Sequence, residues 1–239
     1  MNRASLADLA ELARQRRSAL DEEIAAWRRG PGAGVRLWCG PGCGNCCTLA
    51  VNATLPEALV IAGRLDGPQR LLLSATVARL IDHAGQCRDP RTFLAGYRQA
   101  VGPCPFLDEL ANCIIYPERP LACRALLATR PPDWCGVNLA ELDEFDRTSF
   151  LAGLDRSVVA FPTHYAAAPQ QLAADYERGL LFAMLRLAGY ALSGNLALLT
   201  WLCGEPGFTA ALLAGPEDLR CFLSARRADQ PFLVQIEAP

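Results

Sequence analysis

The sequence contains no lysine, so all 23 basic residues are arginine, and together with 25 acidic residues they give a formal net charge of −2. The acidic and basic residues are mixed along the chain. It therefore has no basic patch of the kind that binds nucleic acid or an anionic membrane surface. We expect neither a nucleic acid nor a membrane as a partner.

Signals for export and for membrane insertion are also missing. The chain opens with the charged, amphipathic stretch MNRASLADLAELARQRR, where a secretory signal would have a basic region and then an apolar one. The most apolar stretch, residues 179–203, is divided by Arg186 and by the polar break at 193–195. This division predicts two buried helices joined by a turn. The sequence therefore predicts a cytoplasmic protein.

Common enzyme motifs are absent, including the P-loop, the GxSxG elbow and the dinucleotide-binding glycine pattern. There is no internal repeat and no alternation of strands with helices. Hydrophobic residues make up 51% of the 239 positions, which suffices for a sizeable core. Apolar residues at helical spacing predict helices over 5–29, 56–65, 70–83, 91–100, 138–153, 170–192, 195–203 and 216–226.

Residues 102–136 break this helical pattern, because they contain four cysteines, six prolines and only short apolar runs. They predict a hairpin or irregular loop with one brief helix near Arg124, which needs an added staple such as a metal. We therefore expect a mainly α fold with a small irregular or β-hairpin insert rich in cysteine. Residues 1–136 would form a helical region containing this metal-binding module (core 36–136). Residues 137–239 would be a C-terminal helical region packed on it, in one compact domain.

Cysteine, in contrast, is abundant, with eleven residues, nine of them between Cys39 and Cys135. In a reducing compartment, clustered cysteines bind metals or carry out redox chemistry more often than they form disulfides. The other two, Cys203 and Cys221, lie in apolar helical sequence and are expected to be small core residues.

The densest group of cysteines is the run WCGPGCGNCC at residues 38–47. Cys43 and Cys46 form a Cys-x-x-Cys turn, in which glycine lets the backbone fold back with its amides facing the sulfurs. Cys46 and Cys47 are adjacent, so their side chains diverge and are not expected to ligate one ion in the same way. Either two sites share the loop, a polynuclear cluster spans it, or one thiol is free.

The number of candidate ligands supports more than one coordination sphere. A closed zinc site or a four-iron cluster takes four protein ligands. The chain offers eight candidates, which are Cys39, Cys43, Cys46, Cys47, Cys104, Cys113, Cys123 and Cys135. Their division between sites is left open by the sequence.

The two cysteine segments, CGPGCGNCC and CPFLDELANCIIYPERPLACR, together resemble the cysteine-cluster proteins of the YkgJ type. The family pattern is C-x2-C-x2-CC followed by C-x-F-L…C-x-I-Y-x-x-R-P-x-x-C-R. The residues that match its second half are Cys104, Phe106, Leu107, Cys113, Ile115, Tyr116, Arg119, Pro120, Cys123 and Arg124. The resemblance covers about residues 36–136. Three residues separate Cys39 from Cys43 where the family has two, so Cys39 fits the pattern less well than Cys43.

The resemblance implies a zinc- or iron-chelating protein, and most members of the family have no assigned activity. A flagellin lysine N-methylase is its best known enzymatic relative, but only the cysteine motif matches here and nothing corresponds to a methyl-donor or lysine site. The spacing of Cys39, Cys43 and Cys46 also resembles the cluster motif of radical S-adenosylmethionine enzymes. The sequence after residue 47 lacks the alternating strands and helices of their barrel.

Thiolates suit both zinc and iron–sulfur clusters, so the choice of metal depends on the neighbouring residues. Glycine-rich residues 40–44 expose amides that can hydrogen-bond sulfide, and Arg119 and Arg124 can balance the negative charge of a cluster. We assign these two arginines to cofactor binding and expect a four-iron, four-sulfur cluster, with zinc as the alternative. His83, at a helix end, and His164, in a loop, are both expected to have packing roles.

These observations predict a metal-binding protein with one or two cysteine-ligated centres, most consistent with iron–sulfur, and a redox or substrate-binding role. The alternative is a zinc-stapled helical module that docks a protein or peptide partner without catalysis. An enzyme and a thiol redox switch are further hypotheses.

Overall fold

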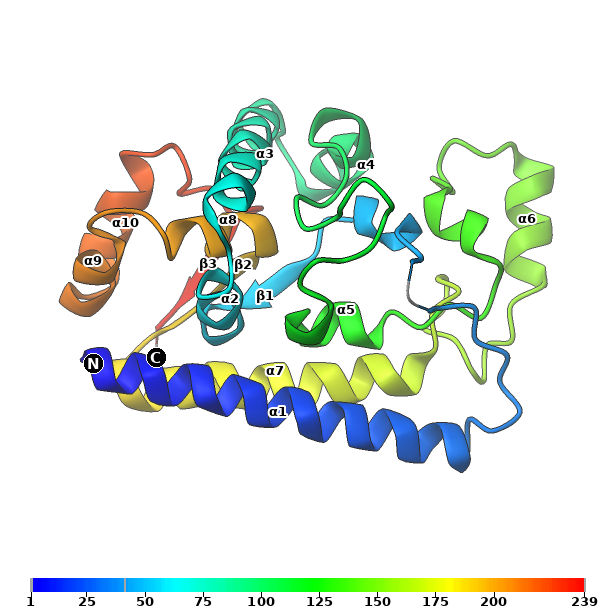
Figure 1. Ribbon diagram of the computed structural model, residues 1–239. Coiled ribbons are helices and arrows are strands. Elements are labelled where there is room, and N and C mark those ends of the chain that lie inside the picture. The colour runs from blue at the N-terminus through cyan, green and yellow to red at the C-terminus, as the bar shows by residue number, and fades with distance from the viewer. Residues whose placement is uncertain (1, 41, 239) are drawn as a thin grey trace.

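The computed structural model describes residues 2–40 and 42–238, and it is mainly helical with one small antiparallel sheet (Figure 1). This confirms the predicted fold class. Two long helices, α1 (Arg3–Arg29) and α7 (Ala167–Ala188), run side by side in opposite directions along one side of the molecule (Figure 1). Leu20 and Leu180 are fully buried between them. The long first helix expected over 5–29 is therefore present.

The sheet has three strands in the order β1-β2-β3, with both pairs antiparallel. The strands are β1 (Asn52–Thr54), β2 (Ala191–Asn195) and β3 (Val234–Glu237). Within β2, a side chain at Gly194 would collide with the carbonyl oxygen of Leu233, so glycine is required for β3 to approach.

The main core surrounds this sheet and is covered by helices from both halves of the chain. Asp66 and Asp89 cap two of these helices with their side chains. The helices are α2 (Leu55–Ala62), α3 (Gly67–Gln86), α4 (Pro90–Ala100), α8 (Leu196–Leu202), α9 (Phe208–Ala214) and α10 (Pro216–Ser224).

The cysteine-rich insert consists of short elements. A hairpin forms around residues 106–114, where Asp108 N–H donates to Asn112 O and Ile114 N–H donates to Phe106 O. The following elements are the 3₁₀ turn η2 (Tyr116–Glu118), α5 (Leu121–Ala125), the 3₁₀ turn η3 (Pro132–Gly136) and α6 (Glu144–Ala152). The irregular hairpin and the brief helix near Arg124 agree with the expectation from sequence.

Two cysteines were expected in the core outside the insert. Cys203 packs against the main core, but Cys221 is exposed, which corrects that expectation. It lies on α10, whose buried face is formed by Leu219 and Leu223, and Cys221 falls on the other face.

None of the helices in the described part of the chain combines the length and the apolar composition needed to cross a bilayer.

Candidate metal centre

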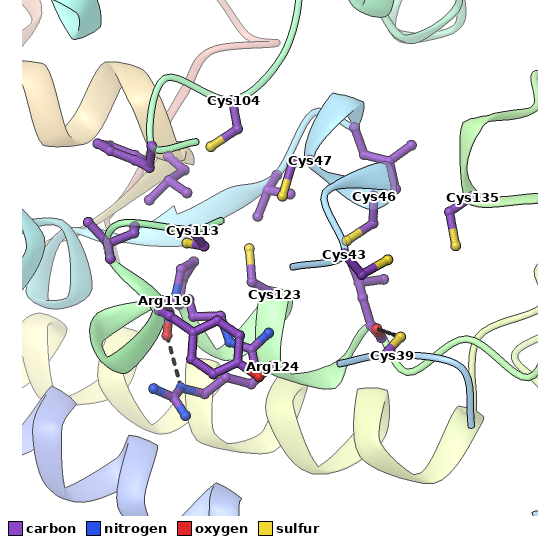
Figure 2. Close-up of a pocket in the computed structure, with 18 of the residues that line it drawn as sticks. Cys39, Cys43, Cys46, Cys47, Cys104, Cys113, Arg119, Cys123, Arg124 and Cys135 are labelled. Carbon is purple, nitrogen blue, oxygen red and sulfur yellow. Dashed lines mark hydrogen bonds between the residues drawn. The ribbon is translucent and has the colours of Figure 1, made fainter. Parts of the chain in front are cut away.

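All eight cysteines predicted as ligands line a single cavity of about 240 Å³ (Figure 2). They come from loop 39–47, from the hairpin and α5, and from η3. Cys87 is the ninth cysteine of the range 39–135. It lies outside the cavity, at the C-terminal end of α3 and next to His83. Thiols from two segments that are distant in the sequence, 39–47 and 104–135, therefore converge on one cavity.

The glycines of the first segment allow its loop to pack closely on the hairpin. Gly42 has a φ of +79°, in the left-handed region that favours glycine. A side chain at Gly44 would press against Ala111 and Leu107. The 3₁₀ turn η1 (Asn45–Thr48) follows, and Cys47 O accepts a hydrogen bond of 2.7 Å from Cys104 N–H. This bond joins the two cysteine segments directly.

The carboxylate of Glu57 holds α5, which carries Cys123. Its Oε1 accepts the Leu121 N–H at 2.8 Å, and its Oε2 accepts the N–H and hydroxyl of Thr54. Glu57 is buried on α2, so the start of α5 is fixed to the main core. Cys123 is thereby placed on a supported element.

The two arginines assigned to cofactor binding take different positions. Arg124, only 7% exposed, turns away to α1 and donates to both carboxylate oxygens of Asp21 at 2.7 and 2.6 Å. It also donates to the carbonyl oxygens of Arg119 and Pro117. The longer dashed line in Figure 2, below the Arg119 label, marks the bond to Arg119 O. Arg124 borders the cavity, but its guanidinium makes a structural clamp.

Arg119 lies beside the sulfurs (Figure 2), with its guanidinium 4.0 Å from the centroid of the Tyr116 ring. Its Nε is buried and has no hydrogen-bond partner among the described residues. Its positive charge lowers the pKa of Cys113 and of Cys123 against the larger, opposite effect of burial. Arg119 is therefore the cation positioned to act on the thiols.

Burial favours the protonated form of several cavity thiols. It raises the pKa of Cys104 to about 12 and that of Cys123 well above the ordinary value. For Cys46 the main cause of its raised pKa is a hydrogen bond with Cys47, followed by burial. Because thiolates are the species that bind metals, a bound metal must displace these protons.

His164 and Tyr165 also lie at the site, although only a packing role was expected for His164. His164 is 5% exposed, and its Nε2 lies 3.3 Å from Cys135 Sγ. Burial lowers the pKa of His164, so the imidazole is neutral at pH 7. Its ring packs against Phe150 and Tyr165. Burial raises the pKa of Cys135 to about 11, and a hydrogen bond with Tyr165 opposes part of that rise. No spacing signal reveals this contact, because 29 positions separate the two residues.

A preformed site for one metal ion is not present among the described residues, since no three Cys, His, Asp or Glu side chains are placed to hold one ion. The sulfurs instead surround the cavity. The arrangement offers sulfur ligands spread over a volume larger than that of a single ion.

A pH effect is expected near α5. Burial, and less strongly the charge of Glu57, raises the pKa of Glu177 from 4.5 to about 7, although its carboxylate accepts the Ala122 N–H. The folded state therefore binds this proton more tightly, and its contribution to stability is lost as pH rises from 4.5 to about 7. The loss is up to about 3 kcal/mol at ~1.4 kcal/mol per pKa unit.

Urea unfolding at several pH values will measure this effect by comparing wild type with Glu177→Gln. The difference in unfolding free energy between the two should change over this range and stay constant above it. A difference that is the same at pH 5 and pH 8 would exclude Glu177 as the source.

Comparisons with known proteins identify the cysteine-bearing segment. Neither the comparison with curated proteins nor that with solved structures gives a match. A family model does match residues 38–147, and its description is "CxxCxxCC: Putative zinc- or iron-chelating domain". The matched range includes all eight cavity cysteines, together with Arg119 and Arg124. Residues 38–147, a little under half of the chain, are thus similar to the CxxCxxCC family of zinc- or iron-chelating domains.

Proposed function

We propose that this protein holds iron–sulfur centres of the four-iron type in its cysteine-lined cavity and that these centres serve electron transfer. The observation that carries the proposal is the gathering of eight thiols around one cavity. The family description supports metal binding and names zinc or iron. When bound, such a cluster supplies one-electron redox chemistry.

The spacing of the sulfurs favours a cluster over a single ion. A zinc ion draws four thiolates to within ~2.3 Å of one point. Each thiolate of a four-iron cluster binds a different iron, so the four sulfurs stay farther apart. Side chains that surround a cavity agree with the second arrangement.

The charges around the cavity point the same way. Four thiolates on an oxidised four-iron cluster leave a net negative charge, which a nearby cation stabilises. Arg119 supplies that cation, and its buried Nε, without a partner among the described residues, has a donor free for an acceptor in the cavity.

Metal and sulfide analysis of protein purified without oxygen tests the proposal. We expect a brown protein with iron and acid-labile sulfide in equal amounts, in multiples of about four per chain. A colourless protein with stoichiometric zinc and no sulfide would contradict it.

The second candidate is a zinc-stapled module that docks a partner. It is favoured by the family description, which includes zinc, and by the scarcity of regular structure in the insert. Such a segment needs a staple to be rigid, whichever metal supplies it. The same analysis decides between the candidates, since this one requires zinc without sulfide.

The state of the thiols supports a reducing location. All eleven cysteines lie in the described part of the chain, and none is paired in a disulfide. We propose a cytoplasmic protein on this basis.

His164 is expected to tune the centre that contains Cys135. A metal-bound Cys135 thiolate can only accept a hydrogen bond, so Nε2 must carry the proton and donate it. Hydrogen bonds to cluster sulfurs raise the reduction potential because they stabilise the more negative, reduced state. Losing ~1 kcal/mol of such stabilisation should lower the potential by about 40 mV, since a tenfold change in equilibrium constant (~1.4 kcal/mol) corresponds to ~59 mV for one electron.

His164→Phe therefore should keep its iron but be reduced at a lower potential in a redox titration followed by electron paramagnetic resonance. The matched control is His83→Phe, because His83 is the other histidine and contacts Phe93 O outside the cavity. Equal potentials in all three proteins would rule out the tuning role.

A further inference from the structure

In the view of Figure 2, the eight sulfur atoms around the cavity fall into two sets that meet at the neighbouring residues Cys46 and Cys47. We call the set that includes the exposed Cys39 the outer set, and its members are Cys39, Cys43, Cys46 and Cys135. The members of the inner set are Cys47, Cys104, Cys113 and Cys123. The sequence left this division open.

Contacts around η3 hold the outer set together. Cys46 and Cys135 share one small apolar cluster, because η1 packs on η3. Cys39 and Cys43 lie close enough to Cys135 for their charges to raise its pKa, after the larger effect of burial. Ala128 N–H donates to Cys39 Sγ at 3.1 Å and fixes that sulfur near the others.

The hairpin and α5 hold the inner set. Cys104 and Cys113 pack against the main core, and their charges raise the pKa of Cys123 after the larger effect of burial. Cys47 joins them through its carbonyl oxygen, which accepts the Cys104 N–H at 2.7 Å. Cys46 also raises the pKa of Cys104, Cys113 and Cys123, and for Cys123 its effect exceeds that of Cys113, as expected for a sulfur at the boundary between the sets.

Local geometry explains why neighbours would serve different sites. Cys46 and Cys47 lie in the 3₁₀ turn η1, where successive side chains leave the axis about 120° apart, so the two thiols can contact each other and still face different neighbours. Four cysteines are the ligand number of one closed zinc site or one four-iron cluster. Each set therefore has the complete number of ligands for one centre.

We infer that the chain has two separate four-cysteine sites, the outer set and the inner set, with Cys46 and Cys47 assigned to different centres. The division into two sites holds for either metal, and only the identity of the metal rests on the proposed function. Arg119 borders the shared cavity and affects thiols of both sets, so it lies between the two sites.

Neighbouring single substitutions test the division. Cys46→Ala and Cys47→Ala should each lose about half of the bound metal, and electron paramagnetic resonance should show that each keeps the centre the other loses. Cys46→Ala should lose the same centre as Cys135→Ala, and Cys47→Ala should lose the same centre as Cys123→Ala. The control is Cys221→Ala, an exposed cysteine outside the cavity, which should keep all the metal. The division is overturned if Cys46→Ala and Cys47→Ala lose the same centre, if either loses all the metal, or if both keep all of it.

Wild-type protein provides a second test that does not depend on the folding of variants. Stepwise removal of metal by a chelator, with alkylation and mass spectrometry at each step, should release the thiols in two blocks of four. Cys46 and Cys47 should become reactive in different blocks, and simultaneous release would contradict the division. If wild type contains zinc without sulfide, the proposed function fails. The division is still tested by the loss of half of the metal in each variant and by the release of the thiols in two blocks of four.

Discussion

Removing metal from the loaded protein is expected to release residues 38–47 and 102–136 from their packed arrangement while the sheet and the α1–α7 pair stay folded. Among the described residues of these ranges, α5 is the one α-helix, and most of the other backbone hydrogen bonds are short-range turn contacts. Structural metals in small domains contribute on the order of 10 kcal/mol to folding. The insert should therefore depend on the metal far more than the helical core does.

Hydrogen–deuterium exchange with mass spectrometry will measure this dependence. Protection in residues 102–136 should fall roughly a hundredfold or more on chelation, which corresponds to about 3 kcal/mol of local stability. Peptides from α3 and β2 provide the internal control, since they belong to the main core. Unchanged protection in the insert would show that its own packing suffices.

Arg124→Met is expected to destabilise the protein by about 3 kcal/mol. Methionine keeps much of the apolar volume but leaves the carbonyl oxygens of Pro117 and Arg119 without their donor. Asp21 is 52% exposed, so water can solvate its carboxylate, and the larger part of the cost comes from the carbonyls. The segment that carries Arg119 should also loosen, with partial loss of metal from the inner set.

Urea unfolding of wild type and of this variant gives the free-energy difference directly. The matched control is Arg178→Met, which breaks an ion pair with Asp175 that is about two-thirds exposed on both sides and should cost less than ~1 kcal/mol. If both variants cost the same small amount, Arg124 does not clamp the insert to α1.

The helices could be predicted because their signals are local. Apolar spacing placed α2, α3 and α4 within a few residues of their observed bounds, and side-chain caps at Asp66 and Asp89 fixed two starts. Helix α6 begins at Glu144, later than the expected 138, because the Asp143 side chain accepts the Asp146 N–H and caps it there.

The sheet could not be predicted in the same way. Each strand is three to five residues long, and their partners are distant in sequence, as with Ala53 and Gly194. Helix α7 was expected to continue to 192, but it ends at Gly189, whose φ of +77° closes the helix. Helix α9 was also not expected, because this apolar helix after Gly207 is only seven residues long.

For the site, the spacing of cysteine, glycine and arginine identified which residues gather, and all eight cysteines line the cavity. The role of Arg124 depends on Asp21, which is 103 positions away, and the contact of His164 with Cys135 joins two loops. Spacing within a motif carries no information on such contacts. The division of thiols into two sets also required their directions in space.

Anomalous scattering at the iron absorption edge, from crystals grown without oxygen, will show directly whether the cavity binds two iron centres. We expect two separate iron peaks in the cavity, one bordered by Cys46 and Cys135 and the other by Cys47 and Cys123. A cavity without anomalous signal, or one whose sulfurs are joined in disulfides, would contradict it.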